Sequence, residues 1–201
     1  MSARDEILTR VREAIAPVPA PAADLTRDYR TRTGDGVDTF IARLRHYQAQ
    51  THRVPESELG RTVVATLRER HAHLIVAPEG IPRDWLVGLE PLHDTPPLDP
   101  QTLDGAGAVV TTCAVAIAQT GTIVLDGSTG MGRRALSLVP DYHLCVVRTD
   151  QIVSSVPEAI ARLDPLRPLT FISGPSATVD IEMVRVAGVH GPRRLEVIIA
   201  G

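Results

Sequence analysis

Lysine and asparagine are absent from this chain of 201 residues, so all 21 of its basic residues are arginine. Without lysine, the protein cannot form a Schiff base through a side chain or hold phosphates with the lysine of a P-loop. The 24 acidic residues bring the net charge to −3, which leaves no positive excess for a nucleic-acid backbone. The composition therefore excludes lysine-based catalysis and predicts no nucleic-acid partner.

Cysteine is also scarce, since only Cys113 and Cys145 occur and each lies within an apolar run. Such a placement is typical of buried, reduced thiols. Two isolated cysteines are too few ligands for an iron–sulfur cluster or a structural zinc site. We therefore predict no metal site and no cofactor on this chain.

Long apolar runs are missing as well. No stretch approaches the ~18 apolar residues of a membrane-spanning helix, and the first residues lack the apolar core of a signal peptide. The sequence therefore predicts a cytoplasmic protein without a membrane span. Its length and its 43% apolar content are sufficient to bury the core of one compact domain without disulfides.

The chain is predicted to have three parts. Residues 1–16 form an amphipathic helix, which Ser2 and Asp5 can cap reciprocally. Residues 17–36 are rich in proline at the start and in polar residues and glycine at the end, as in a linker. Residues 37–201 form the compact domain. The first helix could dock on its own domain, on a second copy in a homo-oligomer, or on another protein.

Within the domain, helical and strand patterns alternate. Two helices, 38–47 and 59–67, come first, and residues 91–105 resemble a loop. Strands are predicted at 73–77, 106–111, 122–125, 143–148, 169–173 and 195–200, and helices at 84–89, 133–139, 156–163 and 177–187. This alternation predicts an α/β fold with a largely parallel sheet and helices on both faces.

Open parallel sheets bind ligands outside the carboxyl ends of their strands. The rule points to the loops 119–122, 126–134 and 173–180. In the first loop, Thr120, Gly121 and Thr122 can offer hydroxyls and backbone N–H groups to an anionic or hydroxylated substrate. The alternative is a tight turn satisfied by its own side chains.

The second loop combines glycines with two adjacent arginines. Arg133 or Arg134 could bind the carboxylate or phosphate of a substrate bidentately. The spacing of the loop matches neither a P-loop nor a dinucleotide-binding fingerprint. The alternative is a surface turn with solvated arginines.

The third loop supplies further candidates for substrate binding, namely Ser173, Gly174, Ser176, Thr178 and Asp180. Ser176 or Thr178 can cap the N–H groups of the predicted helix 177–187. The charge of Asp180 would be stabilised near the positive end of that helix.

His190 lies between glycines and a proline just after this predicted helix. Because histidine changes protonation near neutral pH, His190 is the candidate catalytic acid or base. The alternative is a histidine that caps the carboxyl end of the helix.

Four ordered motifs, AIAQTGTIVL, RRALSLVP, SGPSATVDIE and GVHGP, resemble the LUD domain family, and the resemblance covers most of the chain. It implies a Rossmann-like fold similar to the sugar-phosphate isomerase and CoA-transferase group. It also implies a subunit of an L-lactate utilization system, which acts with two partner proteins in oxidising L-lactate to pyruvate. Those partners would carry the iron–sulfur clusters, and the small ligand would be a 2-hydroxy acid.

Two positions depart from the family pattern. Gln119 stands where the family pattern has glutamate, and Ala177 stands where a polar residue is expected. Glutamine can neither attack as a nucleophile nor act as a base. A covalent CoA-transferase mechanism at residue 119 is therefore excluded.

Three functions stay open from the sequence. In a lactate-oxidising complex, His190 would be the base and Arg133 or Arg134 would hold the carboxylate, but the chain has no recognisable electron acceptor. The protein could instead be a stand-alone enzyme for a sugar-phosphate or acyl substrate. The third alternative is a non-catalytic binding or regulatory module that docks through its first helix.

Overall fold

The computed structural model describes residues 2–15, 28–72, 74–178, 186–187 and 190–201. The chain divides into two units, Met1–Arg30 and Thr31–Gly201. The first unit contains α1 (Ala3–Ile15). The Ser2 hydroxyl donates to the Asp5 carboxylate at 2.8 Å, and the Asp5 N–H donates back to the Ser2 hydroxyl at 3.3 Å. The predicted reciprocal cap is therefore confirmed.

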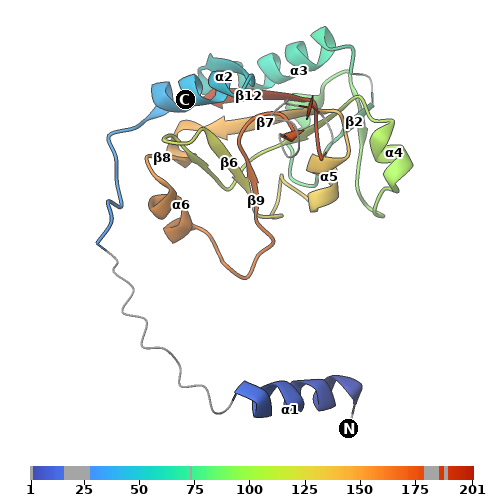
Figure 1. Cartoon of the computed structure of the whole chain (residues 1–201). Helices are drawn as coiled ribbons and strands as arrows, with labels where there is room; N and C mark the ends of the chain where they lie inside the picture. The colour runs from blue at the N-terminus through green and yellow to red at the C-terminus, as the bar shows by residue number, and fades with distance from the viewer. Residues whose placement is uncertain (1, 16–27, 73, 179–185, 188–189) are drawn as a thin grey trace. The chain divides into compact units, whose positions relative to one another are not determined.

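The second unit is built on a six-stranded sheet (Figure 1). In spatial order its strands are β1 (Gln50–Val54), β12 (Arg194–Ala200), β7 (Tyr142–Arg148), β4 (Ala108–Thr111), β2 (Leu74–Val76) and β3 (Glu90–Leu92). Every neighbouring pair is parallel, which confirms the predicted α/β fold. β1 was not predicted because its sequence, QTHRV, lacks the apolar residues of the inner strands.

Alternating side chains divide the core between the two faces of this sheet. Leu144 and Ile198 lie on the face covered by α3 (Leu59–Glu69) and the 3-10 helix η2 (Arg83–Leu86). Cys145 and Val197 lie on the opposite face. The elements that cover this second face are α2 (Val37–His46), a second sheet, α4 (Pro100–Asp104) and α5 (Arg134–Leu138). Figure 1 shows α3 and the second sheet on opposite sides of the main sheet.

The second sheet has four strands, in the order β8 (Ile152–Val153), β5 (Val115–Ile117), β6 (Thr122–Leu125) and β9 (Thr170–Ile172). β6 is antiparallel to both β5 and β9. The expectation that strands 122–125 and 169–173 belong to the parallel sheet is therefore wrong. The connection between β5 and β6 is too short for the crossover that parallel strands need, so these strands form a hairpin.

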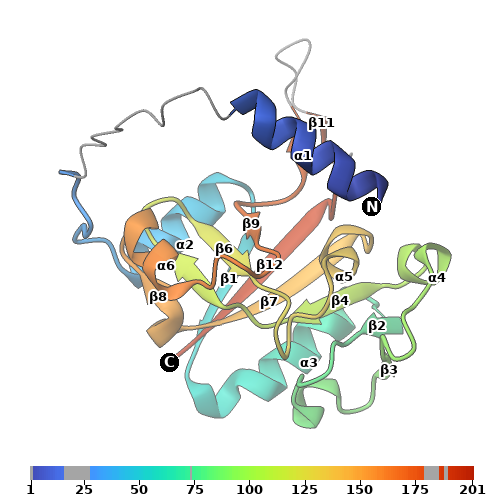
Figure 2. The ribbon, with the colours of Figure 1, turned by 90° about the horizontal axis from the view of Figure 1, so that it is seen from below.

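α6 (Val156–Arg162) packs on the outer face of this second sheet. Seen from below, α6 and α4 lie at opposite ends of the second unit (Figure 2). Ser155 caps α6, since its hydroxyl accepts the Glu158 N–H. The tail of the predicted linker belongs to this unit by its contacts, because the Thr33 N–H donates to the Ser154 hydroxyl at 3.2 Å.

The predicted helix 177–187 is wrong at both of its ends. β10 (Ala177–Thr178) pairs antiparallel with β11 (Val186–Ala187). The β-branched residues Thr178 and Val186 favour extended backbone over helix at these two positions. Residues 179–185, the middle of the predicted helix, lie outside the described residues.

The predicted loop 91–105 also contains regular structure, since β3 and α4 both fall in this part of the chain. α4 begins at a well-formed cap, in which the Asp99 carboxylate accepts the Thr102 N–H at 2.9 Å. Among the residues that the structure describes, no helix has both the length and the apolar character needed to cross a membrane.

A buried carboxylate lies between the main sheet and α3. Glu196 on β12 is only 3% exposed. It accepts hydrogen bonds from the Tyr142 hydroxyl at 2.9 Å and from Arg70 Nε at 3.1 Å, and it contacts His52 Nε2 at 2.5 Å. Burial and the neighbouring Glu196 charge raise the pKa of Tyr142, so this phenol stays a hydrogen-bond donor at all ordinary pH values.

Candidate functional site

A cavity of about 280 Å³ lies at the end of β9, beside the first residues of β7 and β12. We refer to it as the β9 cavity. Its polar side chains are Arg134, Ser137, His143, Thr170, Ser173, Ser176 and His190. Residues from three of the four family motifs line this cavity, although they lie far apart in the sequence.

The fourth motif, AIAQTGTIVL, reaches the cavity through a chain of hydroxyls. Thr120 Oγ1 lies 2.7 Å from Thr122 Oγ1, which in turn lies 2.7 Å from the Ser173 hydroxyl. Thr120 and Thr122 do not line the cavity themselves. They hold Ser173 in place, and linked hydroxyls of this kind polarise one another. Gln119 is exposed beside this chain.

Gly121 has a packing role in this turn. Its φ is +63°, and a Cβ placed on it would lie 2.6 Å from the Arg43 Cβ and 3.0 Å from the Arg43 carbonyl carbon. The turn therefore lies directly against the backbone of α2. Only glycine combines the left-handed conformation with this close approach.

We expect Gly121→Ala to lower the free energy of unfolding by about 2 kcal/mol, because alanine is strained in the left-handed region and clashes with α2. Urea denaturation measures the change. The matched control is Gly34→Ala, since nothing lies within 4 Å of a Cβ at Gly34 and its φ is not left-handed. Equal effects of the two substitutions would contradict the packing role.

His143 is a cavity residue that was not predicted as part of the site. Its ring is almost fully buried at 1% exposure, and Nε2 lies 2.7 Å from the Thr111 hydroxyl. Burial lowers the pKa of His143 to about 4, so the ring is neutral near pH 7. The residue was missed because the run HLCVVR predicts only a buried strand.

This burial makes stability depend on pH in a defined direction. The unfolded chain protonates His143 with a pKa near 6.5, whereas the folded protein keeps the ring neutral down to about 4. As the pH falls through this window, the unfolded state binds a proton that the folded state does not. We expect His143 to contribute a loss of about 3 kcal/mol of unfolding free energy, complete near pH 4.

Urea denaturation of the wild type and His143→Gln at pH 6.5 and pH 4.5 tests this expectation. The variant lacks the titrating ring, so its unfolding free energy should fall less between the two pH values. An identical fall in both proteins would rule out His143 as the source.

The turn after β9 and the segment before β12 are joined by hydrogen bonds. The Ser176 N–H donates to the Pro192 carbonyl at 2.8 Å, and the His190 N–H donates to the Ser176 hydroxyl at 3.1 Å. Gly174, with a φ of +94°, lies where a Cβ would come within 2.6 Å of the Tyr47 Cβ. These contacts place the exposed His190 at the cavity, after a strand and not at the end of a helix.

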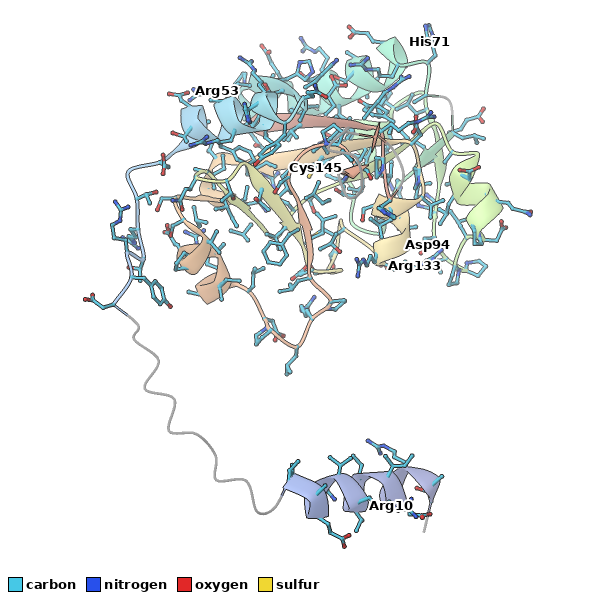
Figure 3. The ribbon with its side chains drawn as sticks, in the orientation of Figure 1. Arg10, Arg53, His71, Asp94, Arg133 and Cys145 are labelled. Atoms are coloured by element: carbon cyan, nitrogen blue, oxygen red, sulfur yellow. The ribbon has the colours of Figure 1, made fainter. Side chains whose placement is uncertain are left out.

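The side chains of Arg133 and Arg134 lie in different surroundings, although the two residues are adjacent in the sequence. Arg133 forms a bidentate ion pair with Asp94, at 2.7 and 3.0 Å, and donates to the Leu98 carbonyl at 2.6 Å (Figure 3). Partial burial alone would raise the pKa of Asp94, but the hydrogen bonds and charge of Arg133 outweigh it, so this pKa is lowered. Arg134 lines the β9 cavity and forms no ion pair with any described residue.

Of the remaining predicted positions, Thr178 lies in β10, while Asp180 falls outside the described residues. Ala177, which stands where a polar residue was expected, lines the β9 cavity. The substrate-binding and catalytic roles assigned from the sequence stay predictions.

The two cysteines lie in the core between the sheets. A hydrogen bond with Cys145 and burial raise the pKa of the Cys113 thiol well above its ordinary value, so it stays protonated. Within the described ranges, no three histidine, cysteine or acidic side chains gather as metal ligands.

Comparison with known proteins identifies the family of this chain. The LUD domain matches residues 100–200. A lactate utilization protein C of Deinococcus radiodurans is 47% identical over 214 residues, covering 99% of this chain and 96% of the relative. The chain therefore belongs to the LUD domain family, as the four motifs predicted.

Two further likenesses differ in extent. A lactate utilization protein C of Shouchella clausii is 36% identical over 90 residues, which cover 41% of this chain and 39% of that protein. The crystal structure of a DUF162 family protein from Deinococcus radiodurans superposes with a TM-score of 0.71 at 45% identity, covering 82% of this chain and 95% of that one.

Proposed function

We propose that this protein takes part in the oxidation of L-lactate to pyruvate and that the β9 cavity binds the 2-hydroxy acid. The observation that carries the proposal is the convergence of Arg134, His190 and the hydroxyls of Ser173 and Ser176 on one small cavity. The names of the relatives, lactate utilization protein C, support the same substrate.

Each part of L-lactate has a matching group in this cavity. The guanidinium of Arg134 can bind the carboxylate through two parallel hydrogen bonds. The hydroxyls of Ser173 and Ser176 can donate to or accept from the substrate hydroxyl. His190 can accept the hydroxyl proton as a general base. The buried, neutral ring of His143 lines the cavity without adding charge.

The electrons require an acceptor from outside this chain. Oxidation of L-lactate to pyruvate releases two electrons and two protons, of which one proton leaves from the hydroxyl group. Both cysteines of this chain are buried, and two are too few for an iron–sulfur cluster. We therefore assign substrate binding and proton transfer to this chain, and electron transfer to iron–sulfur partner proteins.

The adjacent arginines provide a matched test of substrate binding. With the partner proteins reconstituted, we expect Arg134→Ala to raise the KM for L-lactate about 10- to 100-fold, because a charge-assisted hydrogen-bond pair is lost. Arg133→Ala should leave KM unchanged, because Arg133 is already bound to Asp94. L-lactate-dependent dye reduction provides the measurement.

The same assay separates the alternatives. Full activity without this chain would contradict the proposal and favour a binding or regulatory module. Turnover of a sugar-phosphate or acyl substrate by the isolated chain would favour a stand-alone enzyme. Equal KM values for the two arginine variants would remove Arg134 from the carboxylate site.

A further inference from the structure

The strand order of the main sheet contains a topological switch point between β2 and β4. From β2 the chain continues outward to β3, and then returns to β4 and proceeds the other way through β7 to β12. In open parallel sheets, ligands bind outside the carboxyl ends of the strands at such a point. The β9 cavity lies elsewhere, at the amino ends of β7 and β12, because His143 and Leu195 line it.

A larger cavity, of about 850 Å³, lies at this switch point. We refer to it as the switch-point cavity. It is lined by 77–81 after β2, by 93–95 after β3 and by Gly132. Its volume is within the range of small-molecule binding sites.

The loop between β6 and α5 forms one firm edge of this cavity. The Gly130 N–H donates to the Glu79 carbonyl at 2.7 Å, and the Thr112 N–H donates to the Gly130 carbonyl at 2.9 Å. Gly130 has a φ of +82°, and a Cβ there would lie 2.5 Å from the Thr112 hydroxyl. The loop is therefore tied to the chain just beyond both β2 and β4.

The lining of the cavity combines apolar walls with a charged mouth. Its apolar residues are Ala77, Pro78, Ile81, Leu86, Leu89, Pro91 and Leu136. The side chains of Glu79, Arg83 and His93 are exposed at this cavity, and none of them bonds to another described side chain or carbonyl. Asp94 differs, because its carboxylate is bound by Arg133.

We propose that the switch-point cavity binds a mononucleotide. The apolar walls suit the flat base, whose transfer from water they favour. The Glu79 carboxylate accepts hydrogen bonds, and the ribose hydroxyls donate them. The Arg83 guanidinium matches the phosphate in charge and geometry. A nucleotide combines these three chemistries in one ligand of suitable size.

Calorimetric titration of the full chain with adenosine monophosphate tests the proposal. We expect saturable one-to-one binding, with adenosine and inorganic phosphate each bound at least about tenfold more weakly, because each lacks one recognised part. Arg83→Ala should weaken binding of adenosine monophosphate about tenfold and leave adenosine unchanged. Glu79→Ala should weaken both ligands.

The matched control is Arg162→Ala, which removes an exposed arginine on α6 that lines neither cavity. It should leave nucleotide binding unchanged, and the melting temperature of each variant establishes that it folds. Absence of binding at millimolar nucleotide would overturn the proposal, as would binding that is insensitive to Arg83→Ala. Sensitivity to Arg134→Ala instead would place the nucleotide in the β9 cavity. None of these outcomes depends on lactate oxidation.

Discussion

His190→Ala is expected to reduce the kcat of L-lactate oxidation by about 10²- to 10⁴-fold in the reconstituted system, the range over which a general base accelerates proton transfer. The side chain of His190 is exposed, and its backbone N–H donates a hydrogen bond to the Ser176 hydroxyl. The substitution therefore removes the base without loosening the fold. Dye reduction at saturating L-lactate gives kcat, and a co-purification assay establishes that the variant still binds its partners.

The matched control is His46→Gln, because His46 is an exposed histidine at the end of α2 that does not line the β9 cavity. This variant should retain wild-type kcat and KM. If oxidation requires this chain but tolerates His190→Ala, the protein is a scaffold and the base lies elsewhere.

Glu196→Ala is expected to lower the free energy of unfolding by about 3 kcal/mol, because it leaves the donors of Arg70 and Tyr142 without their shared acceptor. Tyr142→Phe removes a single hydrogen bond from the same cluster and should cost about 1 kcal/mol. Urea denaturation compares the two variants with the wild type.

The catalytic properties provide the control for this second prediction. Glu196 lies on the α3 face of the main sheet, whereas Leu195 and His143 face the β9 cavity from the other side. The folded fraction of Glu196→Ala should therefore keep the wild-type KM for L-lactate. A stability loss below that of Tyr142→Phe would show that the cluster is solvated and contributes little.

The parallel sheet could be predicted from the sequence because its inner strands β2, β4, β7 and β12 are short, mainly apolar runs. Edge strand β1 carries no such signal, since a strand paired on one side tolerates polar residues such as Thr51 and Arg53. The second sheet could not be predicted for another reason. An apolar run indicates a strand but does not show which strand it pairs with or in which direction. Here only the short β5–β6 connection distinguishes an antiparallel hairpin from a parallel crossover.

The sequence identified the segments that form the site, but not which of their side chains meet at the cavity. The motifs around Ser173 and His190 were found in the sequence, and contacts across 14 residues bring them together. Which arginine faces the β9 cavity could not be predicted, because Arg133 is in extended backbone and Arg134 begins α5, so their side chains diverge. In the sequence, His143 lies in an apolar run typical of a core strand, and only the structure shows that it lines a cavity.

α5 has a place in the molecule that neither cavity reveals alone. Leu136 faces the switch-point cavity, while Arg134, Ser137 and Leu138 face the β9 cavity. This helix of five residues therefore separates the two cavities. A ligand that displaced α5 would enlarge its own cavity and narrow the other. Binding at the two sites would then be coupled, and each ligand would change the affinity for the other by the same factor.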